Sequence, residues 1–190
     1  EIGVKHILFG FDHLAFVVAL VLLLGLRLDH RLLTTLTAFT LAHSCTLALA
    51  TLHVITLPSP PVEATIAASV VLLAREATHD HLTATRRAPW AVAMIFGLVH
   101  GLGFAGALSE LGLPEDAIGW SLLWFNAGVE VGQILVVAAV IAGSRAGKRL
   151  LGERAAAWGE SCQLYACYGI GVLATWWFID RAAPIVAAWL

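Results

Sequence analysis

The chain is built of long apolar stretches separated by short polar breaks, and this pattern predicts helices that cross a membrane. Runs such as Leu14–Leu26 are continuously apolar, whereas strands of a membrane barrel alternate polar and apolar positions over about 10 residues. Six stretches are apolar enough to cross a bilayer. We therefore expect an all-α integral membrane protein, a six-transmembrane-helix bundle with helices at roughly 3–26, 32–56, 62–77, 89–110, 117–142 and 162–180.

Helix-breaking residues separate these stretches. Pro58, Pro60 and Pro61 end the second helix because proline cannot continue one, and Pro89 stands in the first turn of the fourth. Between the fifth and sixth helices, 145–158 is expected to form a short interfacial helix. We expect one transmembrane helical domain, 1–190. Because the chain opens at Glu1 without Met, we also expect a leader or an N-terminal extracytoplasmic region before it.

Composition and charge agree with a membrane protein. The chain is 59% hydrophobic and only 13% charged, whereas a soluble domain carries about 25% charged residues. Nine of its 11 Lys and Arg residues fall in the loops after the first, third and fifth helices. The positive-inside rule then places both termini outside the cytoplasm. We expect a multi-pass protein of the bacterial inner (cytoplasmic) membrane that contacts membrane lipid, and the net charge of −2 gives no reason to expect nucleic acid.

Ligand-type side chains lie near the midpoints of four expected helices. At 1.5 Å per residue, Asp12 and His13 lie roughly 14–15 Å deep, and His43, His100 and Glu130 are also near midspan. An ionised group in hydrocarbon costs roughly 2.5 kcal/mol or more, so such residues usually face the bundle interior and are functional. Imidazole and carboxylate groups bind divalent transition metals. The sequence therefore predicts a midmembrane metal site.

Further candidate ligands lie closer to the outer side. His6 is expected about two turns outside His13 on the same helix face, and His53 and Glu63 flank the proline loop. A packing role for His53 and a favourable helix-dipole position for Glu63 remain the alternatives. The predicted ligands are His6, Asp12, His13, His43, Glu63, His100 and Glu130. Polar neighbours expected to orient them from behind are Thr40, Ser44, Thr46, Ser69, Asn126 and Gln133.

Glycines accompany these candidate ligands. Gly97 and Gly101 flank the fourth helix's histidine, and Gly128 and Gly132 flank the fifth helix's glutamate. This small-xxx-small spacing lets helices approach closely, which would bring ligands from different helices together. Ordinary membrane packing is the alternative explanation.

The combined motifs resemble those of the HupE/UreJ family. The first helix carries His-x5-Asp-His from His6 to His13, and the later motifs are Phe39-Thr-Leu-Ala-His43-Ser44, His100-Gly-Leu-Gly-Phe-Ala105 and Phe125-Asn-Ala-Gly-Val-Glu130-Val-Gly-Gln133. The resemblance covers the first five expected helices. It implies a nickel or cobalt permease associated with hydrogenase and urease maturation.

Two functions compete for this ligand set. A permease would capture the ion with the outer ligands and hold it at the deep ones, and we expect this transporter rather than an enzyme. The alternative is an intramembrane zinc-dependent hydrolase, in which three ligands leave a fourth position for water. A metal sensor or a subunit of a larger complex ranks third. Ligand chemistry does not distinguish Ni, Co and Zn as the bound divalent metal ion. The oligomeric state also stays open, and a homo-oligomer is one possibility.

Overall fold

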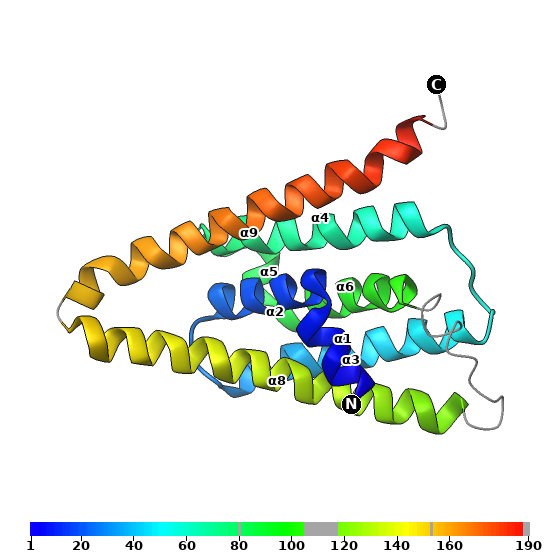
Figure 1. Cartoon of the computed structure of the whole chain (residues 1–190), viewed down its shortest axis with the longest axis horizontal. Helices are drawn as coiled ribbons and strands as arrows, with labels where there is room; N and C mark the ends of the chain where they lie inside the picture. Colours follow the sequence, from blue (N-terminus) through cyan, green and yellow to red (C-terminus); the bar gives the residue numbers. More distant parts are fainter. Residues whose placement is uncertain (80, 105–117, 153, 188–190) are drawn as a thin grey trace.

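The computed structural model describes residues 1–79, 81–104, 118–152 and 154–187, which form helices and short connections with no strand among them (Figure 1). This confirms the all-α class. The helices are α1 (Ile2–Phe9), α2 (Phe11–Leu24), α3 (His30–Thr51), α4 (Ser59–Ala77), α5 (Ala84–Arg87), α6 (Pro89–Gly103), α8 (Ile118–Leu151) and α9 (Arg154–Ala187).

The described residues contain three or four candidate membrane spans, where the sequence predicts six. The α3 helix, Ile118–Leu150 of α8 and Ser161–Ala187 of α9 are long and apolar enough, and α1 with α2 adds a fourth if the bent pair counts as one span. The α4 helix carries Glu63, Arg75 and Glu76 within its 19 residues. The α6 helix has 15 residues, and 105–110, which were expected to extend it, lie outside the described part of the chain.

The first expected span, 3–26, is broken rather than continuous. At Gly10 the backbone is extended, with φ −80° and ψ 94°, and the axes of α1 and α2 meet at a bend of 74°. A Cβ at Gly10 would overlap the carbonyl oxygen of His6 and lie 3.3 Å from Nδ1 of His13. The bend therefore requires glycine, and it changes how the two histidines lie relative to each other.

The hairpin of α8 and α9 is longer than expected. The fifth expected helix, 117–142, continues to Leu151, and no separate interfacial helix forms over the described part of 145–158, which instead completes α8 and begins α9. Gly143 and Gly147 remain helical with open space where a Cβ would point, and Gly152, at φ 55°, follows the end of α8. At 1.5 Å per residue, the 34 residues of α8 span about 51 Å, more than the hydrocarbon core of about 30 Å.

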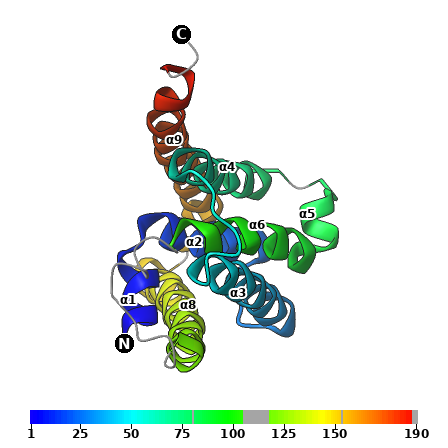
Figure 2. The ribbon, with the colours of Figure 1, turned by 90° about the vertical axis from the view of Figure 1, so that its right-hand side faces the viewer.

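Glycines bring the helices that carry candidate ligands into close contact. The α3 and α6 helices lie side by side, and α1 packs against α8 (Figure 2). A Cβ at Gly101 would overlap the carbonyl oxygen of His43, so α6 approaches the backbone of α3 directly. A Cβ at Gly128 would lie 3.1 Å from Cα of Gly3, so α8 approaches α1 in the same way.

The connections that carry most basic residues gather at one end of the bundle. The guanidinium of Arg86 donates to the carbonyl oxygens of Leu23 at 3.4 Å, Glu76 at 3.3 Å and His79 at 2.6 Å. These bonds join the ends of α2 and α4 to α5, and the turn from α8 to α9 lies at the same end (Figure 1). The assignment of this end to the cytoplasm, with both termini outside, stays a prediction.

Candidate metal centre

Four histidines from four helices form one cluster, which we call the histidine cluster: His6 of α1, His13 of α2, His43 of α3 and His100 of α6. The ring centroid of His13 lies 4.3 Å from that of His6, 5.8 Å from that of His43 and 4.9 Å from that of His100. The rings of His6 and His43 are 5.9 Å apart. The structure thus brings together three deep histidines and one that the sequence places nearer the outside.

The break at Gly10 explains the position of His6. On a continuous helix, residues seven apart are separated by about 10.5 Å along the axis, which would put His6 on a separate outer level from His13. The bend of 74° folds α1 back, so the two rings nearly touch. The sequence predicts an outer His6 and a deeper His13 at two separate depths, whereas the structure places both in one group of four imidazoles.

The cluster is enclosed by aromatic side chains, and several of its ring nitrogens have no partner. His43 and His100 are fully buried, and His13 is 7% exposed. The ring centroid of Phe104 lies 4.0 Å from that of His6, and the ring centroid of Phe16 lies 5.0 Å from that of His100. Within the described residues, the nitrogens without a hydrogen bond are Nε2 of His6, Nε2 of His13, both nitrogens of His43 and Nδ1 of His100. Leaving buried polar atoms unpaired is costly, so the gathering of five such nitrogens in one place points to a bound ligand.

Ser69 of α4 fixes the protonation of one ring. Its hydroxyl has a single proton, which it donates to the carbonyl oxygen of Ile66 at 2.6 Å. Its oxygen lies 3.0 Å from Nε2 of His100 and therefore accepts a hydrogen bond from that nitrogen. On this ground we assign the proton of neutral His100 to Nε2, which leaves Nδ1 with a free lone pair. A metal-binding histidine typically has its other nitrogen held in this way.

Four ring separations within the cluster are close to those expected around a single metal ion. A metal–nitrogen bond of about 2.0–2.1 Å puts each ring centre about 3.2 Å from the ion, and neighbouring ring centres then lie about 4.5–5.2 Å apart for square-planar to tetrahedral angles. The four separations given above, 4.3–5.9 Å, bracket this range. Among the described residues, no group of three His, Cys, Asp or Glu is arranged to hold a metal as it stands, so binding requires these side chains to move.

A cavity of about 400 Å³ connects the cluster to charged groups. His6, His13 and His100 line it, as do Asp12, Glu63, Lys5 and Arg181. The cavity lies between α1, α2, α4, α6 and α9. Charged side chains therefore line an approach to three of the four imidazoles.

Asp12 does not point its oxygens at the histidines, because Arg181 of α9 holds both of them. The guanidinium donates to Oδ1 of Asp12 at 3.0 Å and to Oδ2 at 2.9 Å. Arg181 also lies 3.7 Å from Oε2 of Glu63, a carboxylate that accepts a hydrogen bond from Ser59. The sequence reasoning missed Arg181, since it counted this residue only as a flanking charge at the end of the last span. Its one signal was an arginine next to a long apolar run.

Glu130 lies away from the histidine cluster, although the sequence placed it at the same depth. Its Oε1 accepts a hydrogen bond of 2.6 Å from Thr37, which precedes His43 by six residues, or about 9 Å along α3. Gln133 is fully buried and accepts a hydrogen bond of 3.1 Å from Thr40, while its Nε2 has no partner. These groups form a second polar contact between α3 and α8.

The other polar residues expected to orient the ligands bond elsewhere. Asn126 and Ser44 bond to backbone carbonyls of their own helices, at Leu122 and Thr40, respectively. His53 is exposed after the end of α3, with φ 55°. Of the residues proposed to support the ligands, only Ser69 and Thr46 touch the surroundings of the cluster in the described structure: Ser69 through the ring of His100, and Thr46 through the carbonyl oxygen of His43.

Comparison with known proteins gives one match. The profile of the family described as HupE / UreJ protein matches residues 1–181. Neither a curated protein nor a solved structure matches the chain. The family comprises accessory membrane proteins generally related to nickel and cobalt transport. Because the match spans all four helices of the histidine cluster as well as Arg181, the chain belongs to the HupE/UreJ family.

Proposed function

We propose that this protein is a divalent transition-metal permease that carries Ni²⁺ or Co²⁺ through the histidine cluster. The observation that carries the proposal is the convergence of four imidazoles from α1, α2, α3 and α6 with five ring nitrogens unpaired. Neutral imidazole suits Ni²⁺, Co²⁺ and Zn²⁺, and the family relationship favours the first two. We further propose that the chain acts in the bacterial inner membrane with six spans and both termini outside.

The approach to the cluster supports transport. The cavity lined by Asp12 and Glu63 presents carboxylates to an incoming cation, and His6 and His13 lie at its inner wall. A hydrated ion would exchange water for carboxylate oxygen and then for imidazole nitrogen, a sequence of harder to softer ligands. In this scheme Asp12 and Glu63 act before the cluster, and His43 and His100 hold the ion at its deepest point.

The hydrolase alternative has less support. An intramembrane zinc enzyme needs three fixed ligands and a water position that is open to a lipid substrate. The cavity that reaches the cluster carries four charged side chains next to the apolar Phe9, Ile66 and Phe104, and a hydrated cation needs such charged groups whereas a lipid acyl chain does not. We therefore rank transport first and keep metal-dependent hydrolysis as the function to be tested if transport fails.

Flux of radioactive ⁶³Ni²⁺ into proteoliposomes tests the proposal. Replacing His13 and His43 with alanine together should abolish uptake, because two of the four ring ligands are removed. His81→Ala is a matched control, since His81 is exposed at the basic end, away from the cluster. Normal uptake by the double variant would refute the proposal.

A further inference from the structure

Arg181 occupies the place that a metal ion would take at Asp12. Both carboxylate oxygens of Asp12 accept hydrogen bonds from this one guanidinium, at 2.9 and 3.0 Å. The same guanidinium donates to the carbonyl oxygen of Glu63 at 3.3 Å. Such fork-like pairing is a strong arrangement for an arginine and a carboxylate, and it takes one lone pair on each oxygen of Asp12 and offsets the negative charge that would attract a cation.

The ion pair lies within the cavity that leads to the histidines rather than on the outer surface. The side chains of Arg181 and Asp12 are 22% and 21% exposed, and both line the cavity with His6, His13 and His100. The other cation of this cavity, Lys5, is held by exposed Glu1 at 2.6 Å. Arg181 is therefore the cation that neutralises the acidic groups nearest the cluster.

Arg181 also has an aromatic neighbour in its present position. The guanidinium carbon lies 5.9 Å from the ring centre of Trp177, one turn earlier on α9. An arginine that leaves Asp12 can keep a favourable cation–π contact with this ring, because such contacts extend to about 6 Å. Release of Asp12 thus does not require the charge to enter the apolar surroundings unaccompanied.

From this geometry we propose that Arg181 is a tethered cation that competes with the transported metal for Asp12 and Glu63. The arginine holds the two carboxylates while no metal is present, and an arriving divalent ion takes them by displacing it. This proposal rests on the proposed function, and it adds a specificity-determining residue to that function. A monovalent cation gains less from the carboxylates than a divalent one, so the competition selects for divalent ions.

Binding of Ni²⁺ to the purified full chain in nanodiscs, measured by isothermal titration calorimetry, tests this competition. Arg181→Gln should raise the affinity at least about tenfold, because the competing charge is removed while a polar side chain remains. Arg181→Lys should stay near wild type. Lys5→Gln is the matched control, since it removes the other cation of the cavity, and it should change the affinity less than about twofold.

The double variant Arg181→Gln, Asp12→Asn should lose the gain, which shows that the effect acts through Asp12. Unchanged or weaker Ni²⁺ binding by Arg181→Gln would refute the proposal, and a lowered melting temperature in that case would identify a merely structural ion pair. The proposed function fails separately, through normal ⁶³Ni²⁺ flux in the variant that lacks His13 and His43.

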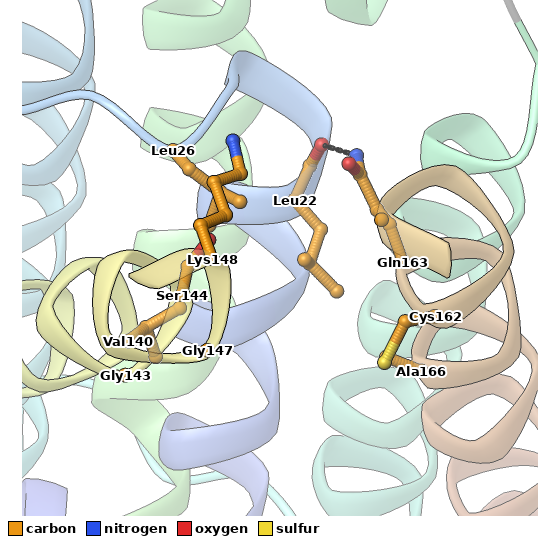
Figure 3. A pocket seen from close by; sticks show the side chains of 11 residues that line it. Leu22, Leu26, Val140, Gly143, Ser144, Gly147, Lys148, Cys162, Gln163 and Ala166 are labelled. Atoms are coloured by element: carbon orange, nitrogen blue, oxygen red, sulfur yellow. Dashed lines mark hydrogen bonds between the residues drawn. The ribbon is translucent and has the colours of Figure 1, made fainter. Parts of the chain in front are cut away.

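An independent observation concerns an apolar cavity at the opposite end of the bundle. It measures about 410 Å³ and opens between α8, α9 and the end of α2 (Figure 3). Leu22, Leu26, Val140, Cys162 and Ala166 contribute to its walls. The amide of Gln163 is turned away from an incoming ligand, because it donates to the carbonyl oxygen of Leu22 at 2.9 Å. The interior of the cavity therefore suits a hydrocarbon chain.

Lys148 is the charged side chain among the described residues that line this cavity, and a span that begins at Ile118 would put it at the level of lipid headgroups. It follows Ile118 by 30 residues, or about 45 Å along α8, which exceeds the hydrocarbon thickness of about 30 Å. Arg145 and Arg149, from the same stretch of α8, line a different cavity with Ala142 and Ala146. Apolar walls beside one basic residue match the two parts of an anionic phospholipid.

We infer that this cavity binds an anionic phospholipid, with an acyl chain between α8 and α9 and the phosphate beside Lys148. Native mass spectrometry of the purified chain, equilibrated with equal amounts of phosphatidylglycerol and phosphatidylcholine, tests the assignment. Wild type should retain phosphatidylglycerol at least about fivefold more often.

Two variants distinguish the contribution of the headgroup to lipid binding from that of the acyl chain. Lys148→Gln should remove the preference for phosphatidylglycerol, and Gly147→Leu should reduce retention of both lipids, because its side chain enters the cavity from a position where a Cβ meets no neighbour. Lys5→Gln, which alters a cation at the other end, should leave both unchanged. Equal retention of the two lipids by wild type, or an unaltered preference in Lys148→Gln, would exclude the site.

Discussion

Ser69→Ala provides a sharp test of the histidine cluster, because it removes the one hydrogen-bond partner that the described residues offer to the ring of His100. The hydroxyl of Ser69 accepts from Nε2 of His100 at 3.0 Å while it donates to the carbonyl oxygen of Ile66 at 2.6 Å. In the variant, the N–H of a fully buried imidazole has no acceptor. Such an orphaned donor costs about 1–3 kcal/mol, and the proton is free to move to Nδ1, which removes the lone pair meant for the metal.

The expected loss of Ni²⁺ affinity in Ser69→Ala combines the unpaired N–H and the lost lone pair. Loss of a group that orients a metal-bound histidine typically lowers metal affinity by about 10–100-fold, so we expect a decrease in this range for Ni²⁺. Isothermal titration calorimetry of the purified protein measures it, and a thermal melt without metal reports the cost to folding. Ser69→Thr keeps the hydroxyl and should recover most of the affinity.

Ser44→Ala is the matched control for this experiment. Ser44 is also a helical serine next to a histidine in sequence, and it is half-buried. Its hydroxyl, however, donates to the carbonyl oxygen of Thr40 on its own helix. It should therefore change Ni²⁺ affinity by less than about threefold. Equal losses in the two variants, or none in Ser69→Ala, would refute the assignment of the His100 proton to Nε2.

Three further predictions concern the helices that build the cluster. Gly10→Ala should weaken Ni²⁺ binding at least about tenfold in calorimetry, since its Cβ would overlap the carbonyl oxygen of His6 and displace that ring. Gly101→Ala should destabilise the bundle by about 1–3 kcal/mol in denaturant unfolding, because the added carbon meets the backbone of α3 at His43; retained stability would argue against the close contact. Arg86→Ala should lower the melting temperature without changing Ni²⁺ affinity, since Arg86 joins helix ends at the far end of the bundle.

The sequence was a good guide to part of the site. His13, His43 and His100 were expected at one depth, and the structure places them in one cluster. Counting residues along a straight helix gives depth, and glycine spacing indicates which helices approach closely. Both kinds of information are local, so they can be read from a single sequence.

The remaining features depend on information that is not local. His6 joins the cluster because one residue, Gly10, takes an extended conformation that a straight-helix reading cannot anticipate. Arg181 pairs with Asp12 across 169 residues of sequence. Glu130 has the expected depth, but the direction in which a side chain leaves its helix depends on how the helices are rotated against each other. This rotation directs it to Thr37 instead of the histidines.

The broken first span has an electrostatic consequence of its own. Aligned peptide dipoles leave about half a negative charge at the carboxyl end of a helix and about half a positive charge at its amino end. The last turn of α1 carries His6 and the first turn of α2 carries Asp12 and His13, so both dipole ends meet beside the imidazoles. The positive end of α2 stabilises the carboxylate of Asp12, which keeps it ionised even when Arg181 leaves it. The backbone thus helps to hold a carboxylate ready for a cation without any further side chain.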